Sequence, residues 1–300
     1  MRHVARAHAT ALALAIASLV VATPGLAAQP AAAASPLSGD SWAATQRAHK
    51  GTLTIAYYYP LEGFAYRDAN GKLVGLMIDI VDQFRTYLKN VRGTDVTLRT
   101  AEYTDFAQFY AEVQRGQGGV VGVSGTTVTE ARKKEVAFSP PYMSSRPVLV
   151  TNAAVPDLTR RDRIATELAG FTGLAFRGTT LDALMRRLKA ESFPTLQIEA
   201  VTTTQEISDR LSRDPKAFAY MDLSVFWVCR KGGAPIKRHR VADGPPEDFA
   251  FILPLGSDWQ VPLADFFAAN GGYRKGRAYR QLMIKHLGVE LEELLDTSGR

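Results

Sequence analysis

A run of small hydroxyl residues that ends in an arginine is the segment whose residue types and spacing best suit chemistry. Residues 124–132 read Ser-Gly-Thr-Thr-Val-Thr-Glu-Ala-Arg and follow the apolar run 120–123. This pattern predicts a buried strand, a polar loop, and a short helix that starts at Thr129 and Glu130. Backbone N–H groups at a helix start, together with the forked Arg132 guanidinium, can bind a carboxylate. The alternative is that Arg132 is one of three basic residues on an exposed turn.

Sequence patterns typical of catalysis or cofactor binding are not matched. Residues 122–126 resemble a nucleophile elbow, but the second glycine stands one position too early. The glycines at 116–119 precede a strand instead of following one, which is wrong for a dinucleotide-binding loop. Cys229 is the single cysteine, and the five histidines lack metal-ligand spacing. We therefore expect no catalytic residue, no metal and no cofactor.

The overall composition is that of a globular protein. The 300 residues include 46% hydrophobic and 22% charged ones, which excludes a disordered chain, and the length favours two lobes over one core. The net charge of +6 is mild and spread out, and the basic cluster at 237–240 has no aromatic residues between its charges. We therefore expect a solvated surface at this cluster and no nucleic-acid partner.

The start of the chain predicts an export signal. An apolar stretch at 11–22 follows two arginines and is too short for the roughly 20 residues of a membrane-spanning helix. Small residues come next, so we expect 1–28 to be a cleaved signal peptide; a buried N-terminal helix is the alternative. No cysteine follows the apolar stretch, which argues against a lipid anchor. The protein is then periplasmic or secreted, and 29–50 form a linker and a short N-terminal helix.

Strand and helix patterns alternate along the remaining chain. Apolar runs predict strands at 52–57, 96–98, 120–123, 174–176, 196–198, 217–221 and 249–254. Apolar spacing of three and four residues predicts helices at 80–88, 106–113, 180–190 and 206–211, and two more near the C-terminus. Thr104 is the expected cap of the helix at 106–113, and Asn70-Gly71 the expected turn of a hairpin. This alternation predicts α/β layers with largely parallel sheets.

Proline-rich crossovers near residues 147 and 246 divide these elements into two groups. We expect residues 51–147 together with 250–300 to form a first α/β lobe, and residues 148–249 to form a second. Ligands of open α/β sheets bind at the carboxyl ends of the strands. A ligand cleft is therefore expected between the two lobes.

Three stretches of the chain resemble the bacterial type 3 extracellular solute-binding proteins, which supply polar amino acids to ABC transporters. They lie at 63–79, which begins Gly-Phe-Ala-Tyr, at 127–142, which runs from Thr-Val-Thr through the arginine to Phe-Ser-Pro-Pro-Tyr, and at 177–180, which reads Arg-Gly-Thr-Thr. The resemblance covers residues 50–288. It implies a periplasmic-binding-protein type II-like fold, with two α/β lobes joined by a two-segment hinge and a ligand cleft between them.

The resemblance also implies polar contacts to an amino-acid ligand. Arg132 would bind the α-carboxylate, and Gly125 and Thr127 would supply backbone and hydroxyl hydrogen bonds. Thr180 would donate to the carboxylate from the second lobe, and Asp222 would accept from the α-ammonium. An ammonium has three donors and no acceptor, so a carboxylate satisfies and neutralises it. The alternative for Asp222 is that it caps the helix that follows.

Two aromatic contacts are implied as well. Phe106 would form an apolar wall, although it shares a helix face with Phe109 and Tyr110 and could serve only the core. Tyr58 would contact the ligand side chain.

The first loop departs from the family pattern. Many members have an acidic residue where this chain has Tyr58, so specificity for a particular side chain does not carry over. Three consecutive tyrosines, Tyr57 to Tyr59, alternate across a strand. Which of them, or whether Glu62, faces the cleft stays open.

The sequence thus predicts an extracytoplasmic binding protein that is monomeric and not an enzyme. It would capture a small polar ligand, an amino acid or related carboxylate, by hinge closure and deliver it to a membrane ABC transporter permease. Two alternatives stay open. One is a cyclohexadienyl-dehydratase-like enzyme on the same scaffold, although no acidic residue stands just after Asp222 to act as its general acid. The other is an accessory protein that reports the ligand to a partner.

Overall fold

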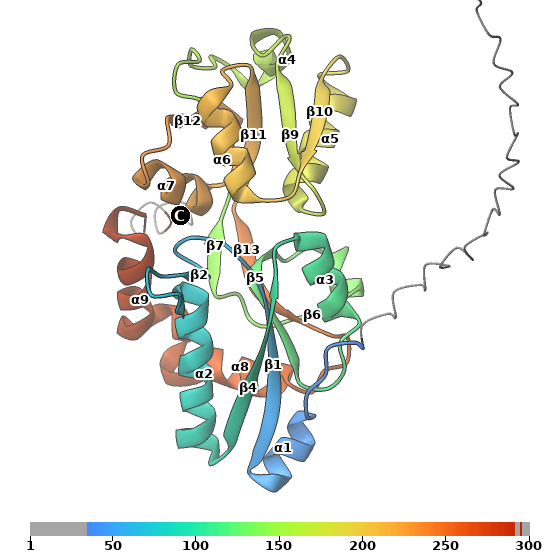
Figure 1. Ribbon diagram of the computed structural model, residues 1–300, viewed down its shortest axis with the longest axis vertical. Helices are drawn as coiled ribbons and strands as arrows, with labels where there is room; N and C mark the ends of the chain where they lie inside the picture. The colour runs from blue at the N-terminus through green and yellow to red at the C-terminus, as the bar shows by residue number, and fades with distance from the viewer. Residues whose placement is uncertain (1–34, 292–294, 296–300) are drawn as a thin grey trace, which may run out of the picture. The chain divides into compact units, whose positions relative to one another are not determined.

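The computed structural model describes residues 35–291 and residue 295. The predicted signal peptide at 1–28 and the start of the predicted linker, 29–34, therefore lie outside the described residues. The described residues from Pro36 onward form one compact unit that contains two large sheets and a small hairpin (Figure 1).

The first sheet takes strands from both halves of the chain. They are β1 (Lys50–Tyr58), β4 (Asp95–Tyr103), β5 (Val120–Thr127), β6 (Ala137–Phe138), β7 (Met143–Ser145) and β13 (Glu247–Leu253). Their order is β4-β1-β5-β13-β6, and β7 also pairs with β13. Strands β4, β1 and β5 are parallel, as predicted, but β13 is antiparallel to its neighbours. The prediction of a largely parallel sheet is wrong there, because β13 brings the chain back from the second sheet.

The second sheet is made from one continuous part of the chain. Its strands are β8 (Pro147–Asn152), β9 (Thr172–Phe176), β10 (Gln197–Val201), β11 (Ala217–Asp222) and β12 (Ile236–Arg238). Their order is β10-β9-β11-β8-β12, in which β10, β9 and β11 are parallel and β8 and β12 are antiparallel to their partners. The chain passes between the sheets after β7 and again before β13, and Figure 1 shows the second sheet above the first.

Helices accompany each sheet. Those of the first are α1 (Trp42–Ala48), α2 (Leu76–Arg92), α3 (Phe106–Gln114), α8 (Gln260–Ala268) and α9 (Arg277–Leu287), and the hairpin β2 (Tyr66–Arg67) and β3 (Leu73–Val74) precedes α2. Those of the second are α4 (Ile164–Glu167), α5 (Thr180–Glu191), α6 (Thr204–Arg213) and α7 (Leu223–Lys231). Short 3-10 helices span Arg132–Lys134, Arg161–Arg163, Arg240–Ala242, Ala269–Gly271 and Tyr273–Lys275.

Helix α2 shows how apolar spacing forms the first lobe. Its residues Ile80, Val81, Phe84 and Leu88 are buried, as their spacing predicts. Burying each such side chain stabilises the fold by about 1.5–3 kcal/mol. The helix ends at Gly93, whose φ of 60° is a conformation that glycine adopts without a steric penalty.

The N-terminus of α3 differs from the prediction. Asp105, not Thr104, is the N-cap, and its carboxylate accepts a hydrogen bond from the backbone N–H of Gln108 at 3.0 Å. Asp105 has the extended backbone of a cap residue, while Thr104 lies one position too early to reach the N–H groups of the first turn. The negative charge at this helix start also suits the helix dipole.

The short helix predicted from Thr129 is a 3-10 turn that begins at Arg132. The Thr129 hydroxyl still acts at its entry, because it accepts a hydrogen bond from the backbone N–H of Arg132 at 3.2 Å. The hydroxyl thus fixes the backbone of the arginine, and the turn is too short to act as a helix dipole.

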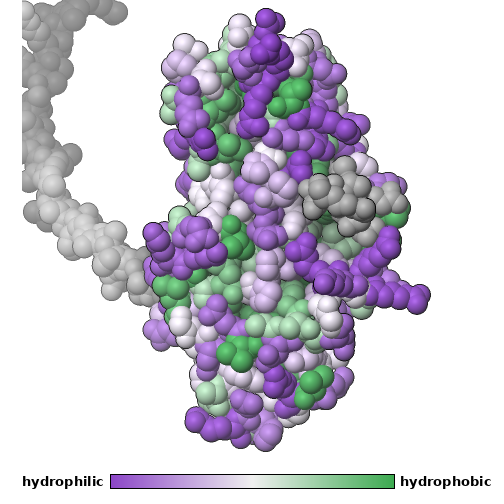
Figure 2. All heavy atoms as spheres, turned by 180° about the vertical axis from the view of Figure 1, so that it is seen from behind, coloured by the Kyte–Doolittle hydropathy of each residue, from purple (hydrophilic) through white to green (hydrophobic). Residues whose placement is uncertain are grey.

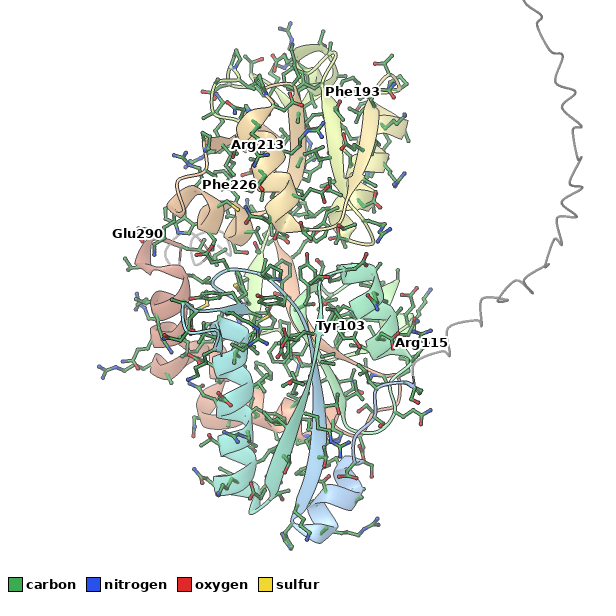
Figure 3. All side chains as sticks on the ribbon, in the orientation of Figure 1. Tyr103, Arg115, Phe193, Arg213, Phe226 and Glu290 are labelled. Atoms are coloured by element: carbon green, nitrogen blue, oxygen red, sulfur yellow. The ribbon has the colours of Figure 1, made fainter. Side chains whose placement is uncertain are left out.

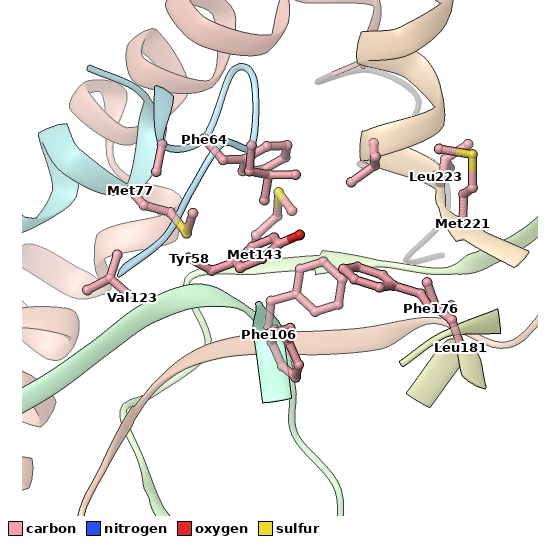
Figure 4. Packing of buried hydrophobic residues seen from close by; sticks show 14 of the residues in the cluster. Tyr58, Phe64, Met77, Phe106, Val123, Met143, Phe176, Leu181, Met221 and Leu223 are labelled. Carbon is pink, nitrogen blue, oxygen red and sulfur yellow. The ribbon is translucent and has the colours of Figure 1, made fainter. Parts of the chain in front are cut away.

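One face of the molecule is mainly polar. Figure 2 shows hydrophilic side chains over most of one face, with hydrophobic ones in small areas between them. Among the described residues, no helix combines the length and the apolar character that crossing a membrane requires. One large cluster of buried hydrophobic residues includes side chains from both lobes, among them Tyr58, Phe106 and Phe176, which lie near one another in Figure 4.

Candidate functional site

A cavity between the two sheets collects every residue that the sequence predicts as a ligand contact. First-lobe elements contribute Tyr58, Phe106, Gly125, Thr127 and Arg132, and second-lobe elements contribute Thr180 and Asp222. Figure 3 shows side chains from both lobes meeting in the region between the sheets. The cavity volume is about 40 Å³, which is room for roughly three water molecules.

Arg132 turns into this cavity and spans the two lobes. Its Nη1 donates to the Thr127 carbonyl at 3.2 Å, and its Nη2 donates to the Gly178 carbonyl of the second lobe at 3.3 Å. The guanidinium carbon lies 5.5 Å from the ring centre of Phe106 and 5.4 Å from that of Tyr110. Burial lowers the pKa of the guanidinium, which nevertheless stays charged. Contacts with other described residues use two of its five N–H donors, so three are left for a ligand.

The alternative for Arg132, an ordinary place on an exposed basic turn, is wrong. Lys133 and Lys134 of the same turn are exposed, and Lys133 pairs with Glu130 at 2.7 Å. Arg132 is half-buried and points the other way, between two aromatic rings. The turn therefore directs Arg132 into the cavity and leaves Lys133 and Lys134 in solvent.

Asp222 ends β11 and faces Arg132 from the second lobe. Its backbone occupies the N-cap position of α7, but its side chain makes no capping hydrogen bond, so the capping alternative is wrong. Within the part of the chain that the structure describes, the carboxylate has no hydrogen-bond donor. Burial raises the pKa of Asp222 to about 8; the Glu247 carboxylate adds to this shift and Arg132 opposes it. Asp222 is thus an acceptor without a partner.

Glu247 is a further acidic residue at the site, and sequence reasoning missed it. It begins β13, and the Thr127 hydroxyl donates to its Oε2 at 3.4 Å. The Thr127 hydroxyl also lies 3.3 Å from that of Thr180, so three side chains from β5, α5 and β13 are linked. Burial raises the pKa of Glu247, and the Thr127 hydrogen bond and Arg132 oppose the shift. The one sequence signal was its position directly after the Gly-Pro-Pro crossover.

Three aromatic rings close one side of the cavity. Tyr58 lies 6.0 Å from Phe106 and 6.1 Å from Phe176, and Phe106 lies 6.4 Å from Phe176, measured between ring centres (Figure 4). Phe106 therefore packs in the core and lines the cavity as well. Phe176, at the end of β9, was predicted only as a buried strand residue.

The structure separates the three consecutive tyrosines. Tyr58 faces the cavity, and its hydroxyl donates to the Thr202 carbonyl at 3.4 Å. The Tyr57 hydroxyl instead reaches Glu102 of the first sheet at 3.4 Å. Tyr59 and Glu62 line a different, outer groove, so Glu62 does not turn into the cavity.

The loop after β9 contacts the first lobe directly. Arg177 forms an ion pair with Asp105, the N-cap of α3. The neighbouring Gly178 has a φ of +78°, and a Cβ added to it would lie 3.0 Å from the Cβ of Ala107. Only glycine suits this conformation and this approach without a steric cost. The lobes are therefore in direct contact beside Arg132.

The sequence comparison decides the family. The model of the bacterial extracellular solute-binding proteins, family 3, matches residues 53–281. This chain belongs to that family. A search of curated proteins returned no match.

Solved structures share the fold of this family 3 solute-binding protein. An ancestral arginine-binding protein bound to arginine has a TM-score of 0.64 and 21% identity, covering 79% of this chain and 98% of that one. The solute receptor for L-cysteine of Neisseria gonorrhoeae has a TM-score of 0.64 and 23% identity, covering 82% and 93%. AncCDT-1, an ancestral amino-acid-binding protein and precursor of cyclohexadienyl dehydratase, has a TM-score of 0.63 and 19% identity, covering 79% and 95%. The predicted periplasmic-binding-protein type II-like fold is thus confirmed.

Proposed function

We propose that this family 3 solute-binding protein captures an amino acid between its lobes and delivers it to a membrane ABC transporter. The proposal rests on one observation, the presence of Arg132 and Asp222 in a single cavity. A guanidinium and a carboxyl group held on opposite lobes match the two charges of a zwitterion, because an ammonium beside Asp222 would favour its ionised form. The amino-acid-binding proteins among the similar structures agree with this ligand class.

The ligand α-carboxylate would bind the free N–H groups of Arg132. The hydroxyl of Thr180 and the backbone of Gly125 lie in the same wall and would complete its hydrogen bonds. The α-ammonium would donate to Asp222, which has no donor among the described residues, and would thereby remove the cost of an unpaired buried carboxylate. Thr127 would orient the ammonium or the carboxylate through its hydroxyl.

Capture requires that the lobes separate. The cavity of about 40 Å³ has room for a few water molecules but is too small for an amino acid in the arrangement described. The lobes at 51–147 plus 250–300 and at 148–249 would rotate about the two crossovers, near Pro147 and Pro246. Ligand contacts from both lobes would then stabilise the closed state. The protein would act outside the cytoplasm as a monomer.

A screen of thermal stability with the twenty amino acids tests the proposal. A ligand at 100 times its Kd stabilises a protein by about 2.7 kcal/mol, which shifts the melting temperature measurably. We expect Arg132→Ala and Asp222→Asn to abolish the shift and Lys133→Ala, on the solvated side of the same turn, to keep it. The proposal fails if no amino acid shifts the folded protein, or if Arg132→Ala binds as the wild type does.

A dehydratase activity on the same scaffold is the second candidate. Burial raises the pKa of Asp222 to about 8, so a protonated carboxylic acid is present in the cavity near neutral pH. That group could act as a general acid. Turnover of prephenate, followed by the gain in absorbance of the aromatic product, would establish this activity, and a shift in stability without turnover would favour the binding protein.

A further inference from the structure

In the proposed complex, the α-carboxylate and the α-ammonium of the ligand pair with both charged residues of the cavity wall. Among the described residues of its wall, Arg132 and Asp222 are the charged ones; Glu247 lies behind Thr127, accepts its hydroxyl hydrogen bond and lines a separate groove. If they bind the α-carboxylate and the α-ammonium, the ligand side chain meets no charged partner inside the cavity. A charged side chain would then be buried without neutralisation, which is strongly unfavourable.

The rest of the wall forms an apolar compartment. Tyr58, Phe106 and Phe176 meet at ring distances of 6.0–6.4 Å, and Leu61 and Phe64 lie beside them; all five side chains are buried. The hydroxyl of Tyr58 is turned to the Thr202 carbonyl, so the ring presents its apolar part to the cavity. Rings at these separations offer edges and faces to a further ring or to an aliphatic group.

We propose that the ligand is an amino acid with a large uncharged apolar side chain, aromatic or aliphatic, and that Phe176 and Tyr58 select it. This inference rests on the proposed function, since it assigns Arg132 and Asp222 to the α-groups. Phe176 is the second-lobe part of the compartment. It therefore contacts the side chain only when the lobes close, and it couples closure to the identity of the ligand.

An outer groove next to the cavity is the alternative place for the ligand side chain. The cavity wall shares Leu61, Thr204 and Val225 with this outer groove, whose volume is about 710 Å³. Three carboxylates, Glu62, Asp68 and Asp209, line this groove together with Arg67. A long cationic side chain that passed the boundary would reach these carboxylates. Leu61 and Val225 are both 8% exposed, so two of the three residues at the boundary are apolar and buried. This favours a side chain that ends inside the cavity.

Isothermal titration of the full protein with a matched series separates the two results. The series is L-phenylalanine, L-leucine, L-norleucine, L-lysine, L-aspartate and L-alanine. We expect phenylalanine or leucine to bind at least about 100-fold more tightly than lysine or aspartate. Norleucine has the unbranched chain of lysine without its charge, and it should bind more tightly than lysine.

The variants Phe176→Ala and Phe176→Leu test the compartment itself. We expect the alanine variant to weaken phenylalanine at least about tenfold and to change alanine binding less than about twofold, because alanine relies on the α-group contacts. The leucine variant retains packing volume and should bind leucine while it loses part of the affinity for phenylalanine. Glu62→Gln, in the outer groove, is the matched control and should leave every affinity unchanged.

Two results would overturn the inference, and they distinguish a failure of the apolar selection from a failure of the proposed function. If lysine binds more tightly than norleucine, and Arg132→Ala abolishes binding, the proposed function stands and the apolar selection is wrong. A loss of lysine binding in Glu62→Gln would then assign the side chain to the outer groove. If no member of the series binds the folded protein, the proposed function fails and the inference fails with it.

Discussion

Asp222 has no hydrogen-bond donor among the described residues, so we predict that it lowers the free energy of unfolding at neutral pH. The carboxyl group is half-buried in the cavity wall, and its pKa is raised from 3.8 to about 8. The native state therefore binds more protons than the unfolded state between these two values, and stability falls as pH rises through this window. We expect Asp222→Asn, which cannot ionise, to be more stable than the wild type at neutral pH.

The magnitude follows from the shift. At pH 7 the interval above 3.8 is about three pKa units, and at 1.36 kcal/mol per unit the proton that Asp222 must take up on folding costs on the order of 4 kcal/mol. The asparagine amide has its own unmet hydrogen bonds, which cost about 1–3 kcal/mol. A net gain of about 1–3 kcal/mol at pH 7 remains. The gain should shrink toward pH 4, where the pH approaches the unfolded pKa of 3.8 and both states bind the proton to a similar extent.

Urea unfolding at pH 5, 6, 7 and 8 measures this difference. The wild type and Asp222→Asn should diverge progressively with pH, and an amino-acid ligand should stabilise the wild type alone. Asp95→Asn is the control, because Asp95 is exposed and forms no ion pair with another described residue. Parallel stability profiles of the wild type and Asp222→Asn across pH 5–8 would refute the reasoning, since Asp222 would then be charged without a cost.

Three further predictions concern the contacts between the lobes and one buried histidine. Arg177→Gln removes the ion pair with Asp105 and should weaken ligand binding by about fivefold or less, as titration would measure, because exposed ion pairs contribute about 1 kcal/mol at most. Gly178→Ala places a Cβ 3.0 Å from Ala107 at a φ of +78°, so small-angle scattering with ligand should show a larger radius of gyration than for the wild type. His239 is buried, accepts a backbone N–H through Nδ1, and has a lowered pKa because of burial. The native state thus resists its protonation, and urea unfolding should show stability that is lost as pH falls below about 6.5, with a smaller loss in His239→Gln.

The site residues that stand at a strand end or a helix start could be predicted from the sequence. The loop after β5 identifies Arg132, the strand end identifies Asp222, and the helix entry identifies Thr180; all three line the cavity. Each is found because a strand end or a helix start has a recognisable residue pattern. The resemblance to the family then supplied the roles that spacing alone left open.

The remaining parts depend on tertiary contacts that have no local signal. Phe176 looks like any buried strand residue, and only the approach of the second lobe brings it 6.1 Å from Tyr58. Glu247 is one acidic residue among thirty, and only the antiparallel entry of β13 brings it to Thr127. The cap at Asp105 was missed by one position, because Thr and Asp are both good cap residues and the choice between them is set by backbone geometry.

The return of the chain to the first sheet also sets an order of assembly. The second sheet draws on one uninterrupted stretch, so its contacts are closer in sequence, and it can form as soon as that stretch is complete. The first sheet must wait for β13, which covers the edge of β5 at Thr127, and for Asp258, which accepts hydrogen bonds from Trp42 and Ala43 at 2.8 and 2.9 Å. During synthesis the β5 edge stays open until most of the chain has emerged. A fragment that stops before Glu247 therefore lacks the wall behind Thr127, and the half of the molecule made first is the half completed last.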